Sequence, residues 1–195
     1  MRTTLTPLLF ALALALLGGC ATTRQLDNDV STYSQWPAGR KPASYAFERL
    51  PSQQARPAQQ QQLEDSARLG LEAAGFTPAA DEREADVSIQ VGARVSASER
   101  SLYDDPFWWR GGFSSRWGRG YSTSWGIHYT SPTYAREVAV LIRDRKSGQA
   151  LFEARASNSG GSTSNAAILA AMFEAALKDF PHTGVNPRRV TVEVR

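Results

Sequence analysis

The sequence predicts an α+β fold: a mixed sheet of about four to five strands, two helices packed on one face of it, and a Gly/Trp-rich hairpin insert. Two segments place apolar residues at helical spacing, and several others alternate apolar with polar residues, as half-buried strands do. Along the chain the order is β-α-β, insert, β-β-α-β, which favours a mixed sheet. The 195 residues, 42% of them hydrophobic, suffice for one such domain after a processed N-terminus.

Residues 1–19 have the features of a secretory signal peptide. Arg2 is the only charged residue before Leu8–Leu17, which is a run of ten apolar residues, and two glycines follow. A positive start, a short apolar run and small residues at the cleavage point define such signals. A membrane-spanning helix needs about 20 apolar residues. The sequence therefore predicts export and cleavage.

The segment Leu17-Gly18-Gly19-Cys20 resembles the lipobox of bacterial lipoproteins. The resemblance implies that Cys20 carries acyl chains such as palmitate and anchors the mature N-terminus in a membrane; several acyl chains anchor stably, whereas one holds only marginally. In Gram-negative lipoproteins the residue after the cysteine directs sorting, and Ala21 implies the periplasmic face of the outer membrane. An ordinary signal peptide with a chance cysteine is the alternative.

The mature chain is expected to begin with a lipidated N-terminus and tether over residues 20–43, because this segment is polar and contains Pro37, Gly39 and Pro42. A single domain over 44–195 follows. Its first strand is expected at 44–49, where aromatic residues alternate with small or polar ones.

Two helices are expected, and each has recognisable ends. The first covers 58–74 and ends at Gly75, which suits a left-handed C-terminal cap. The second covers 164–180, with Ser164 as its N-cap and Pro181 after its end. Its apolar stripe predicts burial, since each such side chain contributes roughly 1.5–3 kcal/mol when buried.

Four further strands are expected. Residues 86–97 alternate regularly and predict one buried and one solvated face. Residues 138–142 are apolar on both faces and predict a central strand. The turn 144–148 joins it to a hairpin partner over 149–156. Residues 190–195 alternate again and predict an edge strand.

Residues 103–134 form an aromatic insert that holds four of the five tryptophans, with glycines and arginines interleaved. Aromatic side chains provide large contact areas, and arginines stack on rings or bind anions. The insert is therefore a candidate binding surface, although a glycine-loosened hairpin whose aromatics only cover the sheet is the alternative. The candidate residues are Trp108, Trp109, Arg110, Trp117, Arg119, Tyr121, Trp125 and Tyr129.

The sequence offers no basis for a catalytic or metal site. His128 and His182 are far apart and lack metal-ligand spacing, and a metal needs three or four converging ligands. No Gly-x-Ser-x-Gly elbow is present, and the loop Gly160–Asn165 lacks the lysine of a phosphate-binding loop. The formal charge falls from +3 to +2 without Arg2, which gives no basic tail for nucleic acid. We expect no enzyme activity, no cofactor and no metal.

Five short motifs occur in order before and after the Gly/Trp-rich insert: Tyr45-Ala46-Phe47, Ala74-Gly75-Phe76, Ala85-Asp86-Val87, the Asp144 to Gly148 turn, and Phe180-Pro181. In this layout and in these motifs the chain resembles the bacterial lipoprotein family called domain of unknown function 4136, over about residues 30–181. The resemblance implies a lipoprotein location and a fold, but no activity. Phe152 stands where the family usually has Trp, and residues 30–37 match only loosely.

Two functional hypotheses follow. The first is an interaction or structural module that binds an envelope protein or a glycan through residues 103–134. The second is a carrier or sensor of a small lipidic or envelope ligand held between the sheet and the helices. An exposed apolar patch would favour the first, and a pocket would favour the second.

Overall fold

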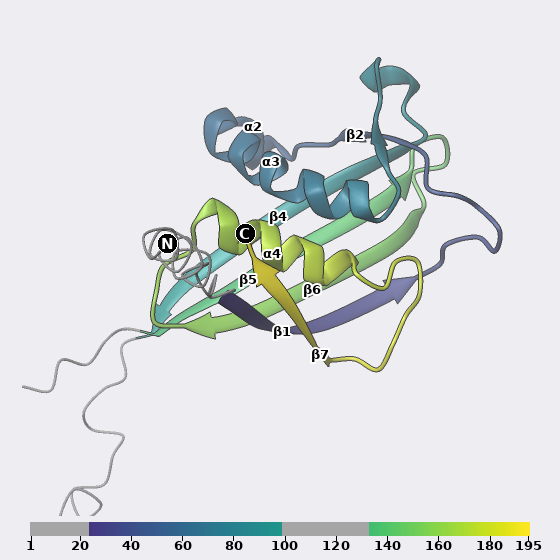
Figure 1. The fold of residues 1–195 in the computed structure, drawn as a ribbon. Helices are drawn as coiled ribbons and strands as arrows, with labels where there is room; N and C mark the ends of the chain where they lie inside the picture. The colour runs from purple at the N-terminus through teal and green to yellow at the C-terminus, as the bar shows by residue number, and fades with distance from the viewer. Residues whose placement is uncertain (1–23, 99–132) are drawn as a thin grey trace, which may run out of the picture.

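The computed structural model describes residues 24–98 and 133–195, which form one mixed seven-stranded sheet with helices against it (Figure 1). The strand order is β3-β2-β4-β5-β6-β1-β7. The strands are β1 (Arg24–Ser34), β2 (Ser44–Phe47), β3 (Thr77–Pro78), β4 (Val87–Ser98), β5 (Thr133–Asp144), β6 (Ala150–Gly160) and β7 (Arg188–Val194). The helices are α2 (Pro51–Gln54), α3 (Pro57–Ala73), the short 3₁₀ helix η1 (Glu82–Glu84) and α4 (Ala166–Leu177).

The predicted α+β class and mixed sheet are confirmed. β2 runs parallel to β3 and β4, whereas the pairs β4–β5, β5–β6, β6–β1 and β1–β7 are antiparallel. The prediction of four to five strands was too low, because β1 and β3 were not expected. The prediction of two helices missed the short helix α2, which begins at Pro51 directly after the first predicted strand. β7 lies at the edge of the sheet, as expected.

The tether predicted over 20–43 is wrong for residues 24–34, which form β1 between β6 and β7. The reason is that two of the four inward-facing side chains of β1 are polar, so its sequence lacks apolar alternation. Asn28 and Thr32 are buried alongside Leu26 and Val30. Asn28 donates to the carbonyl oxygen of Leu26, and the Thr32 backbone exchanges two hydrogen bonds of 2.9 Å with the Asn186 amide. The Thr32 hydroxyl in turn accepts from Arg188 Nη1 at 3.0 Å. These bonds offset part of the cost of burying the polar groups, although the Asn28 Oδ1 atom has no partner.

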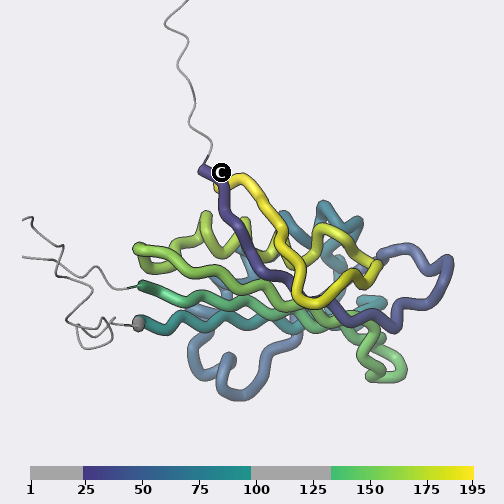
Figure 2. The backbone as a smooth tube through the Cα atoms, turned by 90° about the horizontal axis from the view of Figure 1, so that it is seen from below, coloured from purple at the N-terminus to yellow at the C-terminus, as the bar shows by residue number. Residues whose placement is uncertain are grey.

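Both long helices lie on the same face of the sheet. α3 packs against α4 and over β4, and α4 crosses β5, β6, β1 and β7. The two helices approach closely at Gly70, whose added Cβ would lie 3.1 Å from the Phe173 carbonyl carbon. Figure 2, turned by 90° from Figure 1, shows the molecule from below, with the strands in front of the helices. One face of the sheet is therefore the core, and the other is uncovered in the part of the chain that the structure describes.

The helix ends follow the predicted chemistry with one correction. After α3, Gly75 has a φ of +92°, and the amides of Gly75 and Phe76 donate to the carbonyls of Glu72 and Leu71, which is a Schellman cap. The N-cap of α4 is Asn165 rather than Ser164, because the Asn165 Oδ1 accepts from the Ile168 amide at 2.9 Å.

An aromatic cluster closes one end of the core. The Phe180 ring lies 4.8 Å from Trp36, 5.0 Å from Phe76 and 4.9 Å from Phe152, measured between ring centroids. This cluster thus brings together Phe76 of the Gly-Phe motif, Phe180 of the Phe-Pro motif, and Phe152. Their role is packing, since aromatic pairs of this geometry stabilise cores.

The predicted β5–β6 hairpin is confirmed. Its turn carries Gly148 at φ +71°, and the Asp144 carboxylate accepts from the amides of Lys146 and Ser147. Among the described residues, no helix is long and apolar enough to span a membrane.

Candidate functional site

The eight candidate binding residues and Cys20 lie outside the described residues, but the base of the aromatic insert is defined. β4 and β5 stay paired up to Ser98 and Thr133, so the two strands that carry the insert end side by side. Tyr134 pairs with Gly160, and Arg24 pairs with Val194. One end of the sheet, here called the tether end, therefore contains the start of β1 and the two strand ends that carry the insert (Figure 1). The ends of β6 and β7 lie at the same end.

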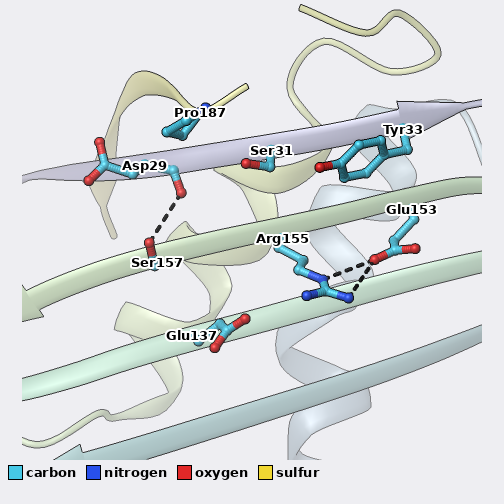
Figure 3. Close-up of a pocket in the computed structure, with 8 residues that line it drawn as sticks. All are labelled: Asp29, Ser31, Tyr33, Glu137, Glu153, Arg155, Ser157 and Pro187. Carbon is cyan, nitrogen blue, oxygen red and sulfur yellow. Dashed lines mark hydrogen bonds and ion pairs between the residues drawn. The ribbon is translucent and has the colours of Figure 1, made fainter. Parts of the chain in front are cut away.

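The uncovered face of the sheet carries a shallow polar trough (Figure 3). Its volume is about 630 Å³, and strands β1, β5 and β6 form its floor. Tyr33 is 58% exposed at its rim, and the Arg155 guanidinium binds the Glu153 carboxylate at 2.8 Å. The trough is lined by Asp29, Ser31, Tyr33, Glu137, Glu153, Arg155, Ser157 and Pro187.

Two pairs of opposite charges, Arg94–Glu137 and Asp29–Arg189, lie across neighbouring strands of this face, with the neutral Ser157 between them. The register places Arg94 opposite Glu137, Glu137 opposite Ser157, Ser157 opposite Asp29, and Asp29 opposite Arg189. Opposite charges at facing positions of antiparallel strands attract each other weakly. This accounts for most of the polar pattern as a solvated sheet surface that favours its own register.

A larger groove, of about 1100 Å³, lies on the other face between α3, α4 and the end of β4. Its apolar lining includes Leu63, Ala93, Val95 and Leu169, and Arg56 and Arg195 are among its polar residues. Val95 is 41% exposed there. The rest of the lining is largely polar and includes Asp65 and the amides of Gln59 and Gln62. A groove of this mixed character suits an amphiphilic molecule better than a wholly apolar one.

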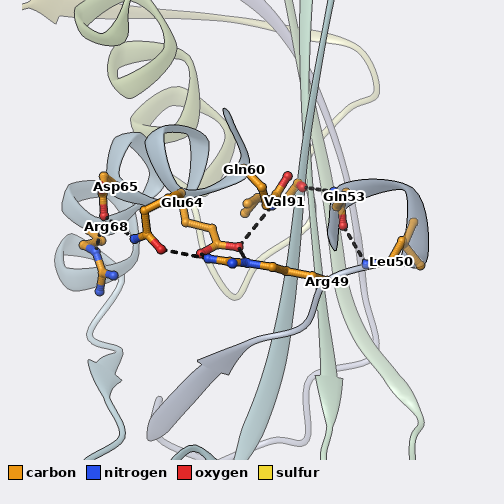
Figure 4. A network of polar contacts seen from close by, with 9 residues as sticks. Arg49, Leu50, Gln53, Gln60, Glu64, Asp65, Arg68 and Val91 are labelled. Atoms are coloured by element: carbon orange, nitrogen blue, oxygen red, sulfur yellow. Dashed lines mark hydrogen bonds and ion pairs between the residues drawn. The ribbon is translucent and has the colours of Figure 1, made fainter. Parts of the chain in front are cut away.

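A half-buried ion pair links α3 to the segment between β2 and α2 (Figure 4). Glu64, only 2% exposed, accepts from Arg49 Nε and Nη2 at 2.6 Å each, and Gln60 donates to the same carboxylate. Hydrogen bonding to Glu64 raises the pKa of Arg49 above its ordinary value. Nearby, Gln53 donates to the Val91 carbonyl at 2.8 Å. All groups in this network satisfy one another, so its role is structural.

Residues 24–98 and 133–195 contain no group of three or more metal-ligating side chains. The loop Gly160–Asn165 provides the cap of α4 through Asn165. Sequence reasoning missed both the trough and the groove. The trough depends on β1, which the sequence did not reveal, and the groove depends on how α3 and α4 lie together, for which a single sequence carries no local signal.

The comparisons with known proteins concern family and fold. The profile of the family described as "Domain of unknown function (DUF4136)" matches residues 29–182. A search of curated proteins finds no match.

Three solved structures show similarity. A PDZ domain protein from Parabacteroides distasonis has a TM-score of 0.53 and 14% identity, with 93% of this chain and 42% of that chain covered. This chain thus corresponds to less than half of that protein, and the likeness concerns the fold. The PelC dodecamer from Paraburkholderia phytofirmans has a TM-score of 0.39 and 18% identity, with 77% of this chain and 94% of that chain covered. A DUF4136 protein from Bacteroides thetaiotaomicron has a TM-score of 0.30 and 19% identity, with 78% of this chain and 94% of that chain covered.

Proposed function

We propose that this chain, which belongs to the DUF4136 family, is a lipid-anchored lipoprotein on the periplasmic face of the outer membrane. In this proposal it is a non-catalytic interaction module that binds an envelope protein or a glycan through the aromatic insert. The supporting observation is the arrangement of the tether end, where the start of β1 and both ends of the insert lie together.

The distance from the anchor to the sheet supports the proposal. Cys20 precedes Arg24 by four residues, and four extended residues span at most about 14 Å. Acyl chains on Cys20 would therefore hold the tether end close to the bilayer surface, and the insert would emerge at the same level. Trp and Tyr favour the membrane–water interface, and Arg favours phosphate groups. The insert would thus meet partners located at or near the membrane surface.

Crosslinking in living cells tests this function. A photoreactive residue at Trp109 or Trp117 should yield a discrete crosslinked protein or glycan. The matched control is a photoreactive residue at Lys146, which is exposed in the β5–β6 turn at the opposite end of the strands. An adduct from the insert but not from Lys146 supports the proposal. Equal adducts from both positions, or none from the insert in an abundant lipidated protein, contradict it.

The groove between the helices and β4 favours a second candidate function, a carrier or sensor of a small lipidic ligand. Extraction of the purified protein followed by mass spectrometry should then release a stoichiometric amphiphile. Ala93→Trp, which fills the groove, should abolish that release. Ala135→Trp is the matched control because Ala135 is exposed on the opposite face, two residues from the start of β5. Release that is unaffected by Ala93→Trp would exclude the groove as the binding site.

A further inference from the structure

Strand β4 is longer than its neighbour on one side. Its pairing with β5 runs from Val87 to Ser98 without a register shift. On the other side, β2 pairs with β4 only as far as Ile89, at the end of β4 that lies away from the tether end (Figure 1). Among the described residues, no strand continues the sheet beside the rest of β4. This half of the strand therefore has an open edge, here defined as the outer side of residues 93–97.

Hydrogen bonds at the covered part of β4 show which residues face this side. The Ile89 carbonyl oxygen accepts from the Glu48 amide at 2.9 Å. The Val91 carbonyl oxygen accepts from the side-chain amide of Gln53 at 2.8 Å, so that Gln53 takes the place of a further strand residue there. In a regular strand the backbone groups of every second residue point to the same side. The odd-numbered residues of 93–97 therefore point to the open edge.

The backbone groups of the open edge have no partner among the described residues. Ala93, Val95 and Ala97 each direct one N–H and one C=O outward, and no hydrogen bond from the described residues reaches that side. A row of unpaired N–H and C=O groups is a template for pairing with another strand. The sheet is thus closed up to Val91 and open to a further strand beyond it.

The same half of β4 also presents an uncovered apolar side to the helix face. Val87, Ile89 and Val91 lie in the core and are 2% exposed or less. The next residues on that side, Ala93 and Val95, are exposed and line the groove between α3, α4 and β4. A strand added at the open edge would place every second side chain over this groove. Peptides that bind by strand addition use this arrangement, in which the backbone gives affinity and alternate side chains give specificity.

Charges around the open edge favour an acidic partner. Arg94 is the only charged residue of the open half of β4, and Arg56 and Arg195 line the groove. None of the three takes part in an ion pair with another described residue. The one acidic side chain among the described residues that line the groove, Asp65, is already bound by Arg68 at 3.0 Å. The arginines therefore remain available to carboxylates of a partner.

A second copy of this chain fits the open edge less well than another protein does. Its own open edge would bring a further Arg94 to a place already flanked by arginines, and like charges on facing strands repel each other. Antiparallel pairing of two β4 strands would also point their tether ends in opposite directions. The anchor proposed at Cys20 requires both tether ends to face one membrane. An extended segment of another protein meets neither difficulty.

We infer that the open edge of β4 and the groove beside it bind an extended, acidic segment of another protein by strand addition. The backbone of the segment pairs with residues 93–97, and its alternate apolar side chains lie over the groove. Its carboxylates meet Arg94 on the uncovered face and Arg56 and Arg195 at the groove. This surface is separate from the aromatic insert, so the proposed function and this inference can fail independently. A lipidic ligand in the groove would not need the β4 amides.

Calorimetry of the full-length protein in a nonionic detergent tests the site with a synthetic peptide. The probe has eight residues of alternating valine and aspartate with blocked ends, and the charge control has lysine in place of aspartate. The acidic peptide should bind, and the lysine peptide should bind roughly tenfold more weakly. Methylation of the backbone nitrogens of one set of alternate residues should abolish binding, whereas methylation of the other set should not, since only every second N–H of an added strand faces β4.

Val95→Pro is the matched variant of the protein. It removes an outward N–H but leaves the ladder with β5, because proline is tolerated where the N–H of an edge strand faces solvent. It should weaken binding of the acidic peptide about tenfold. Val95→Thr keeps the N–H and the branched shape, and its affinity should equal that of the unchanged protein.

Hydrogen exchange of the unchanged protein decides the matter if Val95→Pro does not fold. The acidic peptide should protect the amides of Ala93, Val95 and Ala97. The amides of Arg94 and Ser96 face β5, and their exchange should stay the same with and without the peptide.

Several results overturn the inference. They are no binding of the acidic peptide, an equal effect of the two methylation patterns, and equal protection of odd-numbered and even-numbered amides. Equal binding of the lysine peptide excludes an acidic partner. Self-association in sedimentation that Val95→Pro abolishes would also overturn the inference, because it would identify a second copy as the occupant of the edge.

Discussion

At the scale of single residues, the pair Arg49–Glu64 illustrates how burial decides the cost of a substitution. Glu64 is almost fully buried, whereas the Arg49 side chain is 30% exposed and can turn into water. Removing the arginine leaves a buried carboxylate without its partner, but removing the charge of the glutamate leaves a cation that can be hydrated. Removing Arg49 should therefore cost more stability than removing the charge of Glu64.

We predict that Arg49→Ala lowers the free energy of unfolding by about 3 kcal/mol and Glu64→Gln by about 1 kcal/mol. The amide of Gln can keep one hydrogen bond with Arg49 and accept another from Gln60. Urea unfolding followed by circular dichroism measures both values. A larger loss for Glu64→Gln than for Arg49→Ala would mean that Glu64 does not need Arg49 in the folded protein.

The Asp144 carboxylate predicts a pH effect with a defined direction. The Ser147 amide, then Arg40, then the Ser147 hydroxyl lower its pKa from 3.8 to about 2. Because this pKa is lower in the folded than in the unfolded state, the ionised Asp144 carboxylate contributes to the stability of the fold. That stabilisation is fully present above pH 4 and is lost as the pH falls through 2. Asp144→Asn should therefore reduce the loss of stability between pH 4 and pH 2 in acid titrations. A slope that is the same in the unchanged protein and in Asp144→Asn would contradict the assignment of this window to the turn.

At the scale of secondary structure, the contact between α3 and α4 depends on one glycine. In an ordinary exposed helix, Gly→Ala stabilises by about 0.5–1 kcal/mol. At Gly70 the new Cβ would lie 3.1 Å from backbone atoms of Phe173, which cannot move independently of α4. The helical preference and the packing thus have opposite effects at this position.

We predict that packing prevails and that Gly70→Ala destabilises the protein by about 1–3 kcal/mol. Gly161→Ala is the control, because nothing lies within 4 Å of its added Cβ, and its effect should stay within about 0.5 kcal/mol. Thermal unfolding measures both. A stabilised Gly70→Ala variant would show that the two helices can separate slightly at no cost.

Strand β1 permits a direct comparison between a tether and a sheet element. A tether could be removed without effect, whereas β1 lies between β6 and β7 and buries Val30 completely. We predict that a chain starting at residue 35 fails to fold, and that a chain starting at residue 21 folds. Proteolysis and circular dichroism distinguish the two chains. Folding of the shorter chain would mean that the sheet, including β7, forms without β1.

At the scale of the whole molecule, the positions of the chain ends predict an orientation. If Cys20 is lipidated, the tether end faces the bilayer and the aromatic cluster of Trp36 and Phe180 lies at the far end. A photoreactive lipid should then label the protein at Thr133 but not at Lys146. Mass spectrometry of the labelled peptides measures this. Equal labelling at both positions would show that the domain does not keep one end at the membrane.

The elements differ in how much of them the sequence could predict. Helix α3, strands β4 to β7 and the β5–β6 turn follow from local patterns, because apolar spacing, Gly75 and Gly148 specify their own conformations. Strand β1 could not be predicted, since Asn28 and Thr32 interrupt its apolar alternation and gain their partners only from distant segments. The N-cap of α4 was placed one residue early for a related reason: Ser164 and Asn165 are both good caps, and only the three-dimensional path of the loop selects between them.

The sequence by itself determined the mixed α+β class, the two helices of the core, the hairpin and the family to which the chain belongs, because these depend on periodicity and on motifs that act within a few residues. Only the tertiary structure decided that residues 24–34 are part of the sheet and that the ends of the insert lie beside the start of the tether. It also decided that Arg136 is buried and forms no ion pair with any other described residue. The physical reason is that strand neighbours and buried charges are set by contacts between residues far apart in the chain, and a single sequence does not record which distant residues meet.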